Sequence, residues 1–235
     1  MTEKPTTDAQ RRTFAKAILA HTVQSRTDRT PAQALRSLMN VLFNLLGCAD
    51  AARFTTIDPA FFTDFKSPQR LNDIPTLKAM TRAYLDYVAV LPPFEDAITT
   101  LATEFQGTDG EGLGQFFTPR DLALLSADLA FDHLQRHPSA RHRISDPTGC
   151  GTGSLLLAQL SVLHANAPDL LPVTDIHGLD LDADMVRATA VQIAWNVFVH
   201  RIDIGSLTLH CGNALTDGMT TPPVFVFTPL HPKGF

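Results

Sequence analysis

An acidic residue and three alternating glycines make Asp146–Ser154 (Asp-Pro-Thr-Gly-Cys-Gly-Thr-Gly-Ser) the segment of this chain best suited to chemistry. The short run Arg143–Ser145 before it predicts a strand, and the apolar run Leu155–Leu160 after it predicts a helix. Glycines in such a turn let a ligand approach the backbone, and the helix N-terminus offers free N–H groups to a carboxylate or phosphate. The segment therefore predicts a nucleotide-type cofactor site.

The spacing of the glycines argues against a dinucleotide. The fingerprint G-x-G-x-x-G fails because its third glycine position holds Ser154 or Leu156, depending on the starting glycine. No Gly-Lys-Ser/Thr follows, which excludes a Walker A loop. Asp146 would repel a pyrophosphate, but it can accept hydrogen bonds from an ammonium group or a bound water. A small zwitterionic cofactor fits these residues better.

A second acid follows the next predicted strand, Asp175–Asp180. One carboxylate at such a strand end can accept both hydroxyl hydrogens of a ribose, which suits Asp180. The residues after it open a long helix that runs to about Val199. Asp182 and Asp184 lie in its first turn, where acids offset the helix dipole, so we expect them to cap the helix.

A third predicted strand, Leu207–His210, leads into Cys211–Leu215. Asn213 in this segment could hydrogen-bond an adenine edge. It could equally be a turn residue, since Gly-Asn tolerates unusual backbone dihedrals. The residues alone leave both interpretations open.

Upstream of the glycine turn lies Gly114–Arg120 (Gly-Gln-Phe-Phe-Thr-Pro-Arg). Gln-Phe-Phe-Thr-Pro, then Asp-Pro-x-x-Cys-Gly-Thr-Gly, then an acid after the second strand is an order that resembles the N6-adenine DNA methyltransferases. The resemblance is strongest to the methylation subunit of type I restriction–modification systems, and it covers roughly residues 80 to 228. It implies a Rossmann-like α/β sheet and S-adenosyl-L-methionine as the cofactor.

The resemblance also assigns the cofactor contacts. It implies that Phe117, Thr118 and Pro119 close over the methionine end; that Asp146, Gly149, Gly151 and Gly153 hold the amino acid moiety; that Asp180 binds the ribose hydroxyls with Leu181 beside the adenine; and that Asn213 stands where an aspartate usually contacts the adenine amino group. Thr118 and Pro119 also have a local explanation, as N-cap and first residue of a helix predicted over Arg120–Gln135. The two interpretations are compatible.

The catalytic motif of the resembled family departs from its pattern here. The family places Asn/Asp-Pro-Pro-Tyr/Phe after the fourth strand, where it holds a base outside the DNA stack. The fourth strand is predicted over Val224–Phe227, and Thr228-Pro229-Leu230-His231 follows it. Only Pro229 matches, while Thr228 could accept one hydrogen bond and His231 could stack weakly on a base. The catalytic positions Thr228, Pro229 and His231 are therefore degenerate.

The first hundred residues predict helices. Thr30-Pro31 starts one helix that Gly47 ends, and Leu77–Val90 and Phe94–Phe105 predict two more. We expect a helical domain over 1–106, a glycine-rich linker over 107–114 and a methyltransferase-like domain over 115–235. The sheet of that domain is expected to be incomplete, with about four strands. An exposed apolar edge at its fourth strand would indicate a truncated remnant or completion by a partner chain.

Composition limits the partners. The net charge of −5 is unfavourable for an autonomous DNA binder, so DNA contact is expected through a specificity subunit or a partner methylase chain. The three cysteines form no C-x-x-C pair, and no metal is expected. No apolar run approaches the roughly 18 residues that a membrane span needs, and the N-terminus lacks an apolar signal core, which predicts a cytoplasmic protein without membrane contact. A basic cluster near the predicted helix end is explained by dipole compensation: His133, Arg136, His137, Arg141, His142 and Arg143.

Two functions remain. The first is an N6-adenine-specific DNA methyltransferase of restriction–modification type that binds S-adenosyl-L-methionine, flips an adenine and transfers the methyl group to N6. The second is a catalytically inactive, truncated remnant that binds the cofactor or a partner methylase. An unrelated small-molecule methyltransferase would share the glycine turn but would not predict the upstream Phe117–Pro119.

Overall fold

The computed structural model describes residues 6–48, 51–63, 72–106, 117–136 and 139–229. Its α-helices are Thr7–Gln24 (α1), Pro31–Leu46 (α2), Ile74–Val88 (α4), Thr99–Gln106 (α5), Arg120–Arg136 (α6), Ser154–Asn166 (α7) and Ala183–His200 (α8). Its strands are Thr55–Ile57 (β1), His142–Asp146 (β2), Thr174–Asp180 (β3), Ser206–Cys211 (β4) and Phe225–Phe227 (β5). Short 3₁₀ turns are Ala51–Arg53 (η1), Pro59–Phe61 (η2), Pro168–Val173 (η3) and Gly218–Thr220 (η4). Among the described helices, none has the length and apolar character needed to cross a bilayer.

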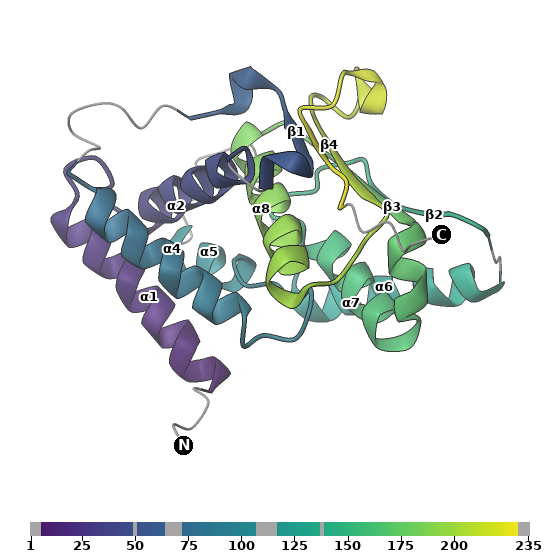
Figure 1. The fold of residues 1–235 in the computed structure, drawn as a ribbon, viewed down its shortest axis with the longest axis horizontal. Helices are drawn as coiled ribbons and strands as arrows, with labels where there is room; N and C mark the ends of the chain where they lie inside the picture. Colours follow the sequence, from purple (N-terminus) through teal and green to yellow (C-terminus); the bar gives the residue numbers. More distant parts are fainter. Residues whose placement is uncertain (1–5, 49–50, 64–71, 107–116, 137–138, 230–235) are drawn as a thin grey trace.

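The strands form one sheet in the order β1-β5-β4-β3-β2 (Figure 1). All four strands expected from the sequence are present, and the α/β fold class is confirmed. The fifth strand, β1, comes from the part of the chain predicted to be helical, and it pairs antiparallel with β5. The expectation that the sheet ends in an open edge at its fourth strand is therefore wrong. Residues from the N-terminal part cover that edge.

The connections explain the strand directions. The helices α7 and α8 carry the chain from β2 to β3 and from β3 to β4, and both strand pairs are parallel. The connection from β4 to β5 holds only η4. Without a long crossover the chain returns beside β4, and β5 pairs with it antiparallel. In the common doubly wound order 3-2-1-4 the fourth strand lies beside the first instead.

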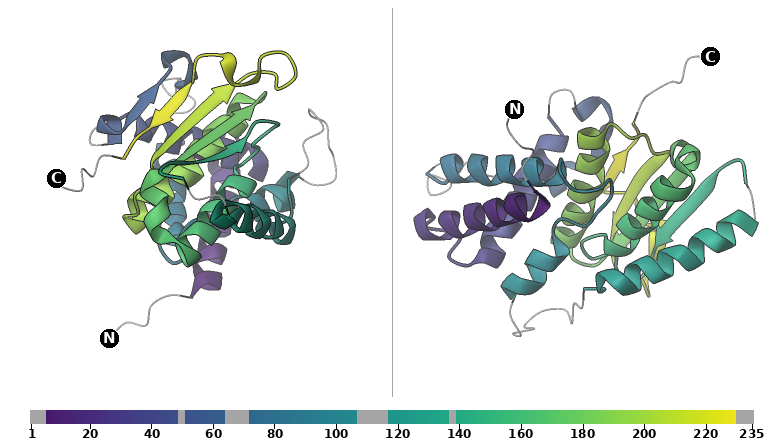
Figure 2. Two further views of the ribbon diagram at one scale, coloured as in Figure 1. Left: turned by 90° about the vertical axis from the view of Figure 1, so that its right-hand side faces the viewer. Right: turned by 90° about the horizontal axis from the view of Figure 1, so that it is seen from below.

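Helices α6, α7 and α8 lie on one face of the sheet, and the N-terminal helices pack beyond α8 (Figure 2). The strands alternate accordingly: Ile144, Ile176 and Leu207 are buried on the helical side. The opposite face carries polar side chains that remain exposed or half-buried, namely Arg143, Ser145, Asp175, His177, Ser206 and Thr208. The sheet is thus apolar on one face and polar on the other.

Several helices begin or end at the residues that the sequence predicted. Thr30 and Gln33 form a capping box at the start of α2, and Gly47 ends this helix as expected. Asp182 caps α8 by accepting from the Asp184 N–H at 2.8 Å. The prediction of a helix from Phe94 is wrong at its start, because Asp96 accepts from the backbone N–H of Thr99 and the helix begins there.

The N-terminal helices and the sheet share one buried core. Helix α2 packs on α8, where the Trp195 indole donates to the Leu42 carbonyl at 3.2 Å. Phe43 of α2 meets Phe225 of β5 with ring centroids 5.6 Å apart. The division into residues 1–106 and 115–235 stays a prediction, and the linker 107–114 lies outside the described residues.

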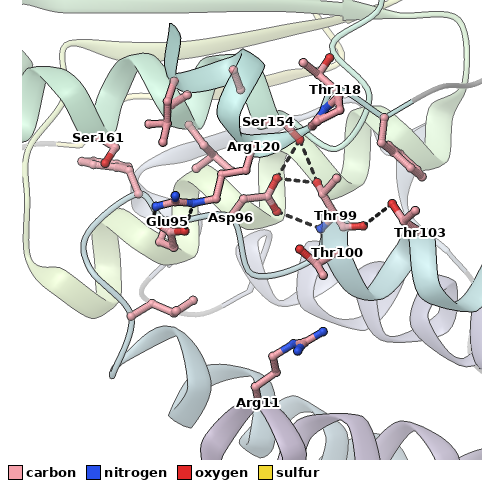
Figure 3. Close-up of a pocket in the computed structure, with 18 of the residues that line it drawn as sticks. Arg11, Glu95, Asp96, Thr99, Thr100, Thr103, Thr118, Arg120, Ser154 and Ser161 are labelled. Carbon is pink, nitrogen blue, oxygen red and sulfur yellow. Dashed lines mark hydrogen bonds and ion pairs between the residues drawn. The ribbon is translucent and has the colours of Figure 1, made fainter. Parts of the chain in front are cut away.

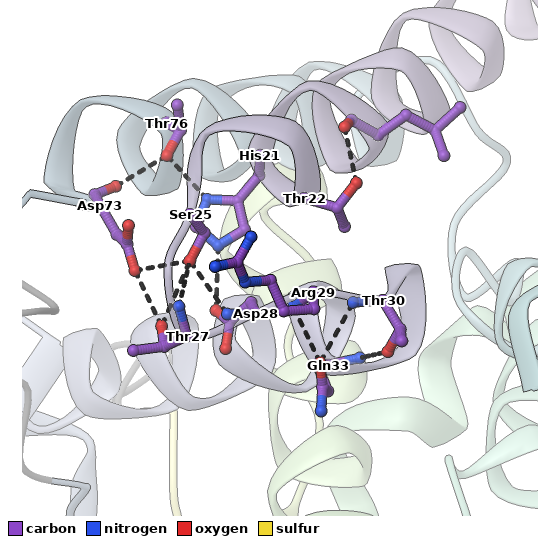
Figure 4. A network of polar contacts seen from close by, with 11 residues as sticks. His21, Thr22, Ser25, Thr27, Asp28, Arg29, Thr30, Gln33, Asp73 and Thr76 are labelled. Carbon is purple, nitrogen blue, oxygen red and sulfur yellow. Dashed lines mark hydrogen bonds and ion pairs between the residues drawn. The ribbon is translucent and has the colours of Figure 1, made fainter.

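A buried polar network joins the turn after α1 to the start of α4 (Figure 4). The His21 ring contacts Asp28 at 2.9 Å through Nε2 and Thr76 at 2.7 Å through Nδ1. Asp73 accepts from Ser25 at 2.8 Å. His21, Asp28 and Asp73 each bring one potential ligand atom within 4.8 Å of the others. Since these atoms already bond within the network, its evident role is to hold α1 against α4.

Candidate functional site

The glycine turn lies at the carboxyl end of β2 and leads directly into α7. Gly149, Gly151 and Gly153 have φ values of +137°, +55° and +91°, in the left-handed region that L side chains rarely adopt. Gly153 is the N-cap of α7. The alternate glycines noted in the sequence are therefore required by the backbone path of the turn itself, whatever it binds.

Cys150 fastens this turn to the sheet. Its N–H donates to the Leu179 carbonyl at 2.9 Å, and its side chain is buried against Gly178 of β3. A Cβ atom on Gly178 would lie 3.3 Å from the Cys150 sulfur and 2.8 Å from Leu209. Burial raises the pKa of the Cys150 thiol to about 12, so the thiol is neutral at physiological pH. Cys150 packs, and Gly178 makes the room for it.

Asp146 and Asp180 flank the turn. The Asp180 carboxylate accepts from the Gly151 N–H and from the Asp182 N–H, each at 2.8 Å. Asp146 is only 6% exposed. Burial raises the pKa of the Asp146 carboxyl above its ordinary value, hydrogen bonds from Thr148 lower it, and the charge of Asp180 raises it further. Neither acid has an ion-pair partner among the residues that the structure describes. The turn is thus flanked by two carboxylates that a positively charged group could pair with.

Leu181 and Asn213 follow the carboxyl ends of β3 and β4, at the same end of the sheet as the glycine turn. Leu181 follows Asp180 directly and is 55% exposed, so an apolar surface is available beside the acid. Asp180 pairs in register with Cys211, two residues before Asn213. The Asn213 amide oxygen accepts from the Leu215 N–H at 2.9 Å, and its backbone N–H donates to Asp217 at 2.9 Å. These contacts support the turn interpretation of Asn213, which uses its amide oxygen locally.

Phe117, Thr118 and Pro119 lie on the other side of the turn, beside the N-terminus of α7. They line a cavity of about 540 Å³ together with Ser154 (Figure 3). Phe117 also lines a smaller cavity with Thr152. Helix α6 begins at Arg120 as predicted, and the Pro119 carbonyl accepts its first bond from Ala123. The structure thus brings this segment to the turn, but none of the described cavities is lined by Asp146 or Asp180.

Asp96 is an unpredicted member of this region (Figure 3). Its carboxylate accepts from the Ser154 hydroxyl at 2.7 Å and from the amide of Gln192 at 3.1 Å. Gln192 is fully buried on α8; it also donates to the Thr152 carbonyl at 2.9 Å and accepts from the Ala97 N–H at 3.0 Å. These bonds join the segment before α5, the glycine turn and α8. Two sequence signals could have revealed these residues. Asp96 lies three residues before Thr99, a spacing at which Asp can cap a helix, and Gln192 is a polar residue in an otherwise apolar helix.

The degenerate catalytic positions lie elsewhere. β5 runs antiparallel to β4, so the chain leaves β5 at the amino ends of the parallel strands, whereas Asp146 lies at their carboxyl ends. There the Thr228 N–H donates to the Phe54 carbonyl at 2.8 Å. β3 and β4 separate β2 from β5. With about 4.8 Å per strand and about 3.3 Å per residue, Thr228 lies on the order of 20 Å from Asp146. The structure does not bring Thr228 and Pro229 to the glycine turn, and His231 lies outside the described residues.

Two solved structures resemble this fold. A protein of Listeria monocytogenes assigned as a class I S-adenosylmethionine-dependent methyltransferase matches with a TM-score of 0.55 and 13% identity, over 91% of this chain and 56% of that one. A type I restriction-modification methyltransferase subunit of Streptococcus thermophilus matches with a TM-score of 0.49 and 11% identity, over 90% and 60%. This chain spans little more than half the length of either. The first match shows the shared fold.

The family model of the N-6 DNA methylases matches residues 90–225. The matched region begins before the Asp96 segment, contains the glycine turn and both acids, and ends within β5. It covers more than half of the chain. On this match, the chain belongs to the N-6 DNA methylase family.

Proposed function

We propose that this chain binds S-adenosyl-L-methionine at the Asp146–Gly153 turn and forms the cofactor-binding part of an N6-adenine DNA methyltransferase of restriction–modification type. The observation that carries the proposal is the pair of carboxylates, Asp146 and Asp180, that flank a glycine turn without an ion-pair partner among the described residues. A ligand with an ammonium group relieves their repulsion, whereas a pyrophosphate would increase it.

The remaining contacts fit the same ligand. The amino acid moiety would lie along the glycine turn, with its carboxylate near the N–H groups at the start of α7. Asp180 keeps acceptor capacity on both oxygens, which suits two ribose hydroxyls. Leu181 would cover one face of the adenine. When bound, this cofactor supplies an electrophilic methyl group, and the chain's own residues orient it and exclude water.

Methyl transfer to an adenine amino group needs no covalent protein nucleophile. The protein contributes by holding the amino nitrogen in line with the methyl group, with reacting atoms about 3–3.5 Å apart. Thr228 and Pro229, on the order of 20 Å from the turn, cannot hold a base there. We infer that the groups that hold the target base come from a partner methylase chain or a specificity subunit, which would also read the DNA.

A second function is favoured by the position of β5. A chain whose fourth methyltransferase strand lies at the wrong edge of the sheet would bind the cofactor or a partner methylase without catalysing transfer itself. Where the chain binds the cofactor, the two functions differ only in whether any partner restores transfer.

Calorimetric titration of S-adenosyl-L-methionine tests the cofactor site. We expect micromolar binding that Asp180→Ala abolishes and that Asp169→Ala, an exposed acid before β3, leaves unchanged. Transfer of a radiolabelled methyl group to duplex DNA, with and without candidate partner subunits, then separates the two functions. Binding without transfer under every combination supports the second function. A folded protein that does not bind the cofactor overturns the first function and leaves only the binding of a partner methylase for the second.

A further inference from the structure

Helices α2 and α4 form an apolar groove on the surface of the N-terminal part of the chain. This α2–α4 groove has a volume of about 480 Å³, and no described residue of α1 or α8 lines it. Its apolar lining comes from both helices: Val41, Leu45, Ile74, Leu77 and Leu85. Leu45 and Ile74 are 40% and 39% exposed. A groove of this kind fits the apolar side of a helix from another polypeptide.

The charged residues of the groove have one sign. Lys78 and Arg82 lie one turn apart on α4, both are exposed, and the described lining contains no Asp or Glu. Arg82 pairs with Asp86 at 3.6 Å, but both side chains are largely exposed and such a pair contributes little stability. An occupant with acidic residues beside its apolar side chains would complement this groove.

Helix α6 carries exposed leucines that have these properties. Leu122, Leu125 and Leu129 are 57%, 56% and 65% exposed, and their spacing of three and four residues puts them on one side of the helix. Ala123 and Ala127 are buried against α7 on another side. Ala127 also lines a cavity between α6 and β2, and none of the three leucines does. This α6 ridge therefore points away from α7 and from the open edge of the sheet.

Acidic residues accompany the α6 ridge. Asp121 and Asp128 are exposed and seven residues apart, so they lie on the same side of the leucines. Asp132 continues this row and is ion-paired with Arg136. In a heptad register that places the three leucines at positions a, d and a, Asp121 and Asp128 take the g positions, which select the charge of a partner. The ridge thus matches the groove in both polarity and charge.

The two surfaces also match in length but lie apart in the molecule. The leucines span about 10 Å along α6, and Val41 to Cys48 of the groove span about the same length of α2. Helices α2 and α4 lie toward one end of the molecule and α6 toward the other (Figure 1). The ridge of a chain therefore meets a groove only in a second copy.

We infer that this chain associates head to tail, with the α6 ridge of one copy docked in the α2–α4 groove of the next. Burial of the leucines supplies the affinity, and the two bases of the groove beside the two aspartates of the ridge fix the orientation. Because the two surfaces differ, each contact leaves one groove and one ridge open, which produces rings or longer chains. The inference does not depend on cofactor binding.

Sedimentation velocity of the full chain over a wide concentration range tests self-association. The mass of the wild-type protein should rise with concentration, whereas Leu45→Lys in the groove and Leu125→Glu in the ridge should each leave monomers. Val23→Lys and Leu19→Glu change exposed apolar residues of α1 and are the matched controls, which should assemble like the wild type. Circular dichroism checks that every variant is folded.

Mixing the two monomeric variants tests the head-to-tail geometry. The Leu45→Lys chain keeps its ridge and the Leu125→Glu chain keeps its groove, so an equimolar mixture should form one-to-one pairs and nothing larger. Recovery of assembly would also show that neither substitution unfolded its chain. A mixture that stays monomeric overturns the inference, as does a wild-type protein that is monomeric throughout, which would leave the groove to a different polypeptide.

Charge reversal tests the orientation in the mixed pair. Asp121→Lys with Asp128→Lys in the chain that supplies the ridge should weaken binding roughly two- to tenfold, as expected for two exposed ion pairs. Lys78→Glu with Arg82→Glu in the chain that supplies the groove should restore it. Binding that the reversed groove does not restore contradicts the pairing of this ridge with this groove.

Discussion

The Asp146 carboxyl group lies in an environment that disfavours its charged form. It is buried next to the glycine turn, and the charge of Asp180 adds to the cost of ionising it. Such a group destabilises the protein without ligand, and a bound cation would relieve the cost. The same electrostatic conflict that makes Asp146 a candidate site residue therefore leads to a prediction about stability.

We expect Asp146→Asn to raise the melting temperature of the ligand-free protein by a few degrees at pH 8. In a protein of this size 1 kcal/mol corresponds to roughly 2–4 °C. Because the folded-state pKa of Asp146 lies above its unfolded value, its ionisation weakens the fold as pH rises. The gain should therefore shrink as pH falls through the raised pKa. Thermal unfolding at several pH values measures this.

The control for this prediction is Asp169→Asn, which removes an exposed acid and should change the melting temperature little. A melting temperature that falls with Asp146→Asn at pH 8 would show that the carboxylate is stabilising, contrary to our interpretation. The variant should also lose S-adenosyl-L-methionine binding, since the neutral amide cannot pair with an ammonium group.

The sequence alone was enough to predict the glycine turn and the strand end at Asp180, because both depend on local spacing. The glycines and Cys150 are adjacent in the chain, and Asp180 ends a recognisable strand. Asp96, Gly178 and Gln192 were missed because their partners are distant in sequence: Asp96 bonds to Ser154 and Gln192, and Gly178 faces Cys150 and Leu209. A lone polar or small residue gives no sign of a partner that only the fold brings near.

At the scale of elements, α8 holds the turn through Gln192. We expect Gln192→Ala to destabilise the fold by about 2–3 kcal/mol, because it leaves the Ala97 N–H and the Thr152 carbonyl buried without partners. Cofactor affinity should fall as well, since the turn loses a fixed contact. Chemical denaturation and calorimetry measure the two effects.

Gln24→Ala, an exposed change near the end of α1, is the matched control for this side chain. If Gln192→Ala lowers stability but leaves cofactor affinity intact, α8 supports the fold without positioning the turn. If both stay unchanged, the hydrogen-bond network does not contribute as the structure suggests.

Strand β1 protects β5, and a single proline tests this. The bonds from Thr228 to Phe54 and from Asp58 to Val224 alternate along the β1–β5 pair, which places Thr56 at a hydrogen-bonded position opposite Val226. Thr56→Pro should cost about 3 kcal/mol or more and promote aggregation through exposed β5. Thr56→Val keeps the β-branched shape and should be close to neutral. Denaturation midpoints and light scattering distinguish these outcomes.

The elements of the α/β part were predictable because their hydrophobic patterns are strong and local. Strands β2, β3 and β4 and helices α7 and α8 agree with the patterns read from the sequence. The direction of β5 and the existence of β1 were not predictable, because both depend on pairing between residues far apart in the chain. A three-residue strand such as β1 is too short to give a periodic signal.

At the scale of the whole molecule, the described N-terminal helices and the sheet share one continuous buried core, and a small second cluster lies between α6 and α7, although the sequence suggested two domains. We therefore expect a single cooperative unfolding transition. Trp195 of α8 donates to the Leu42 carbonyl of α2, so its fluorescence reports the contact between the N-terminal helices and α8. Its midpoint should coincide with that of far-ultraviolet circular dichroism. Two separate midpoints would support the division at residues 107–114 instead.

The thiol of Cys150 has a use beyond packing. Since it is neutral and buried beneath the glycine turn, an alkylating reagent can reach it only when the turn lifts from β3. In a variant with Cys48 and Cys211 replaced by serine, the rate of alkylation of Cys150 measures how often the turn opens. S-adenosyl-L-methionine should lower this alkylation rate, and Gln192→Ala should raise it. The chain thus carries its own chemical reporter for how often its candidate cofactor site comes apart.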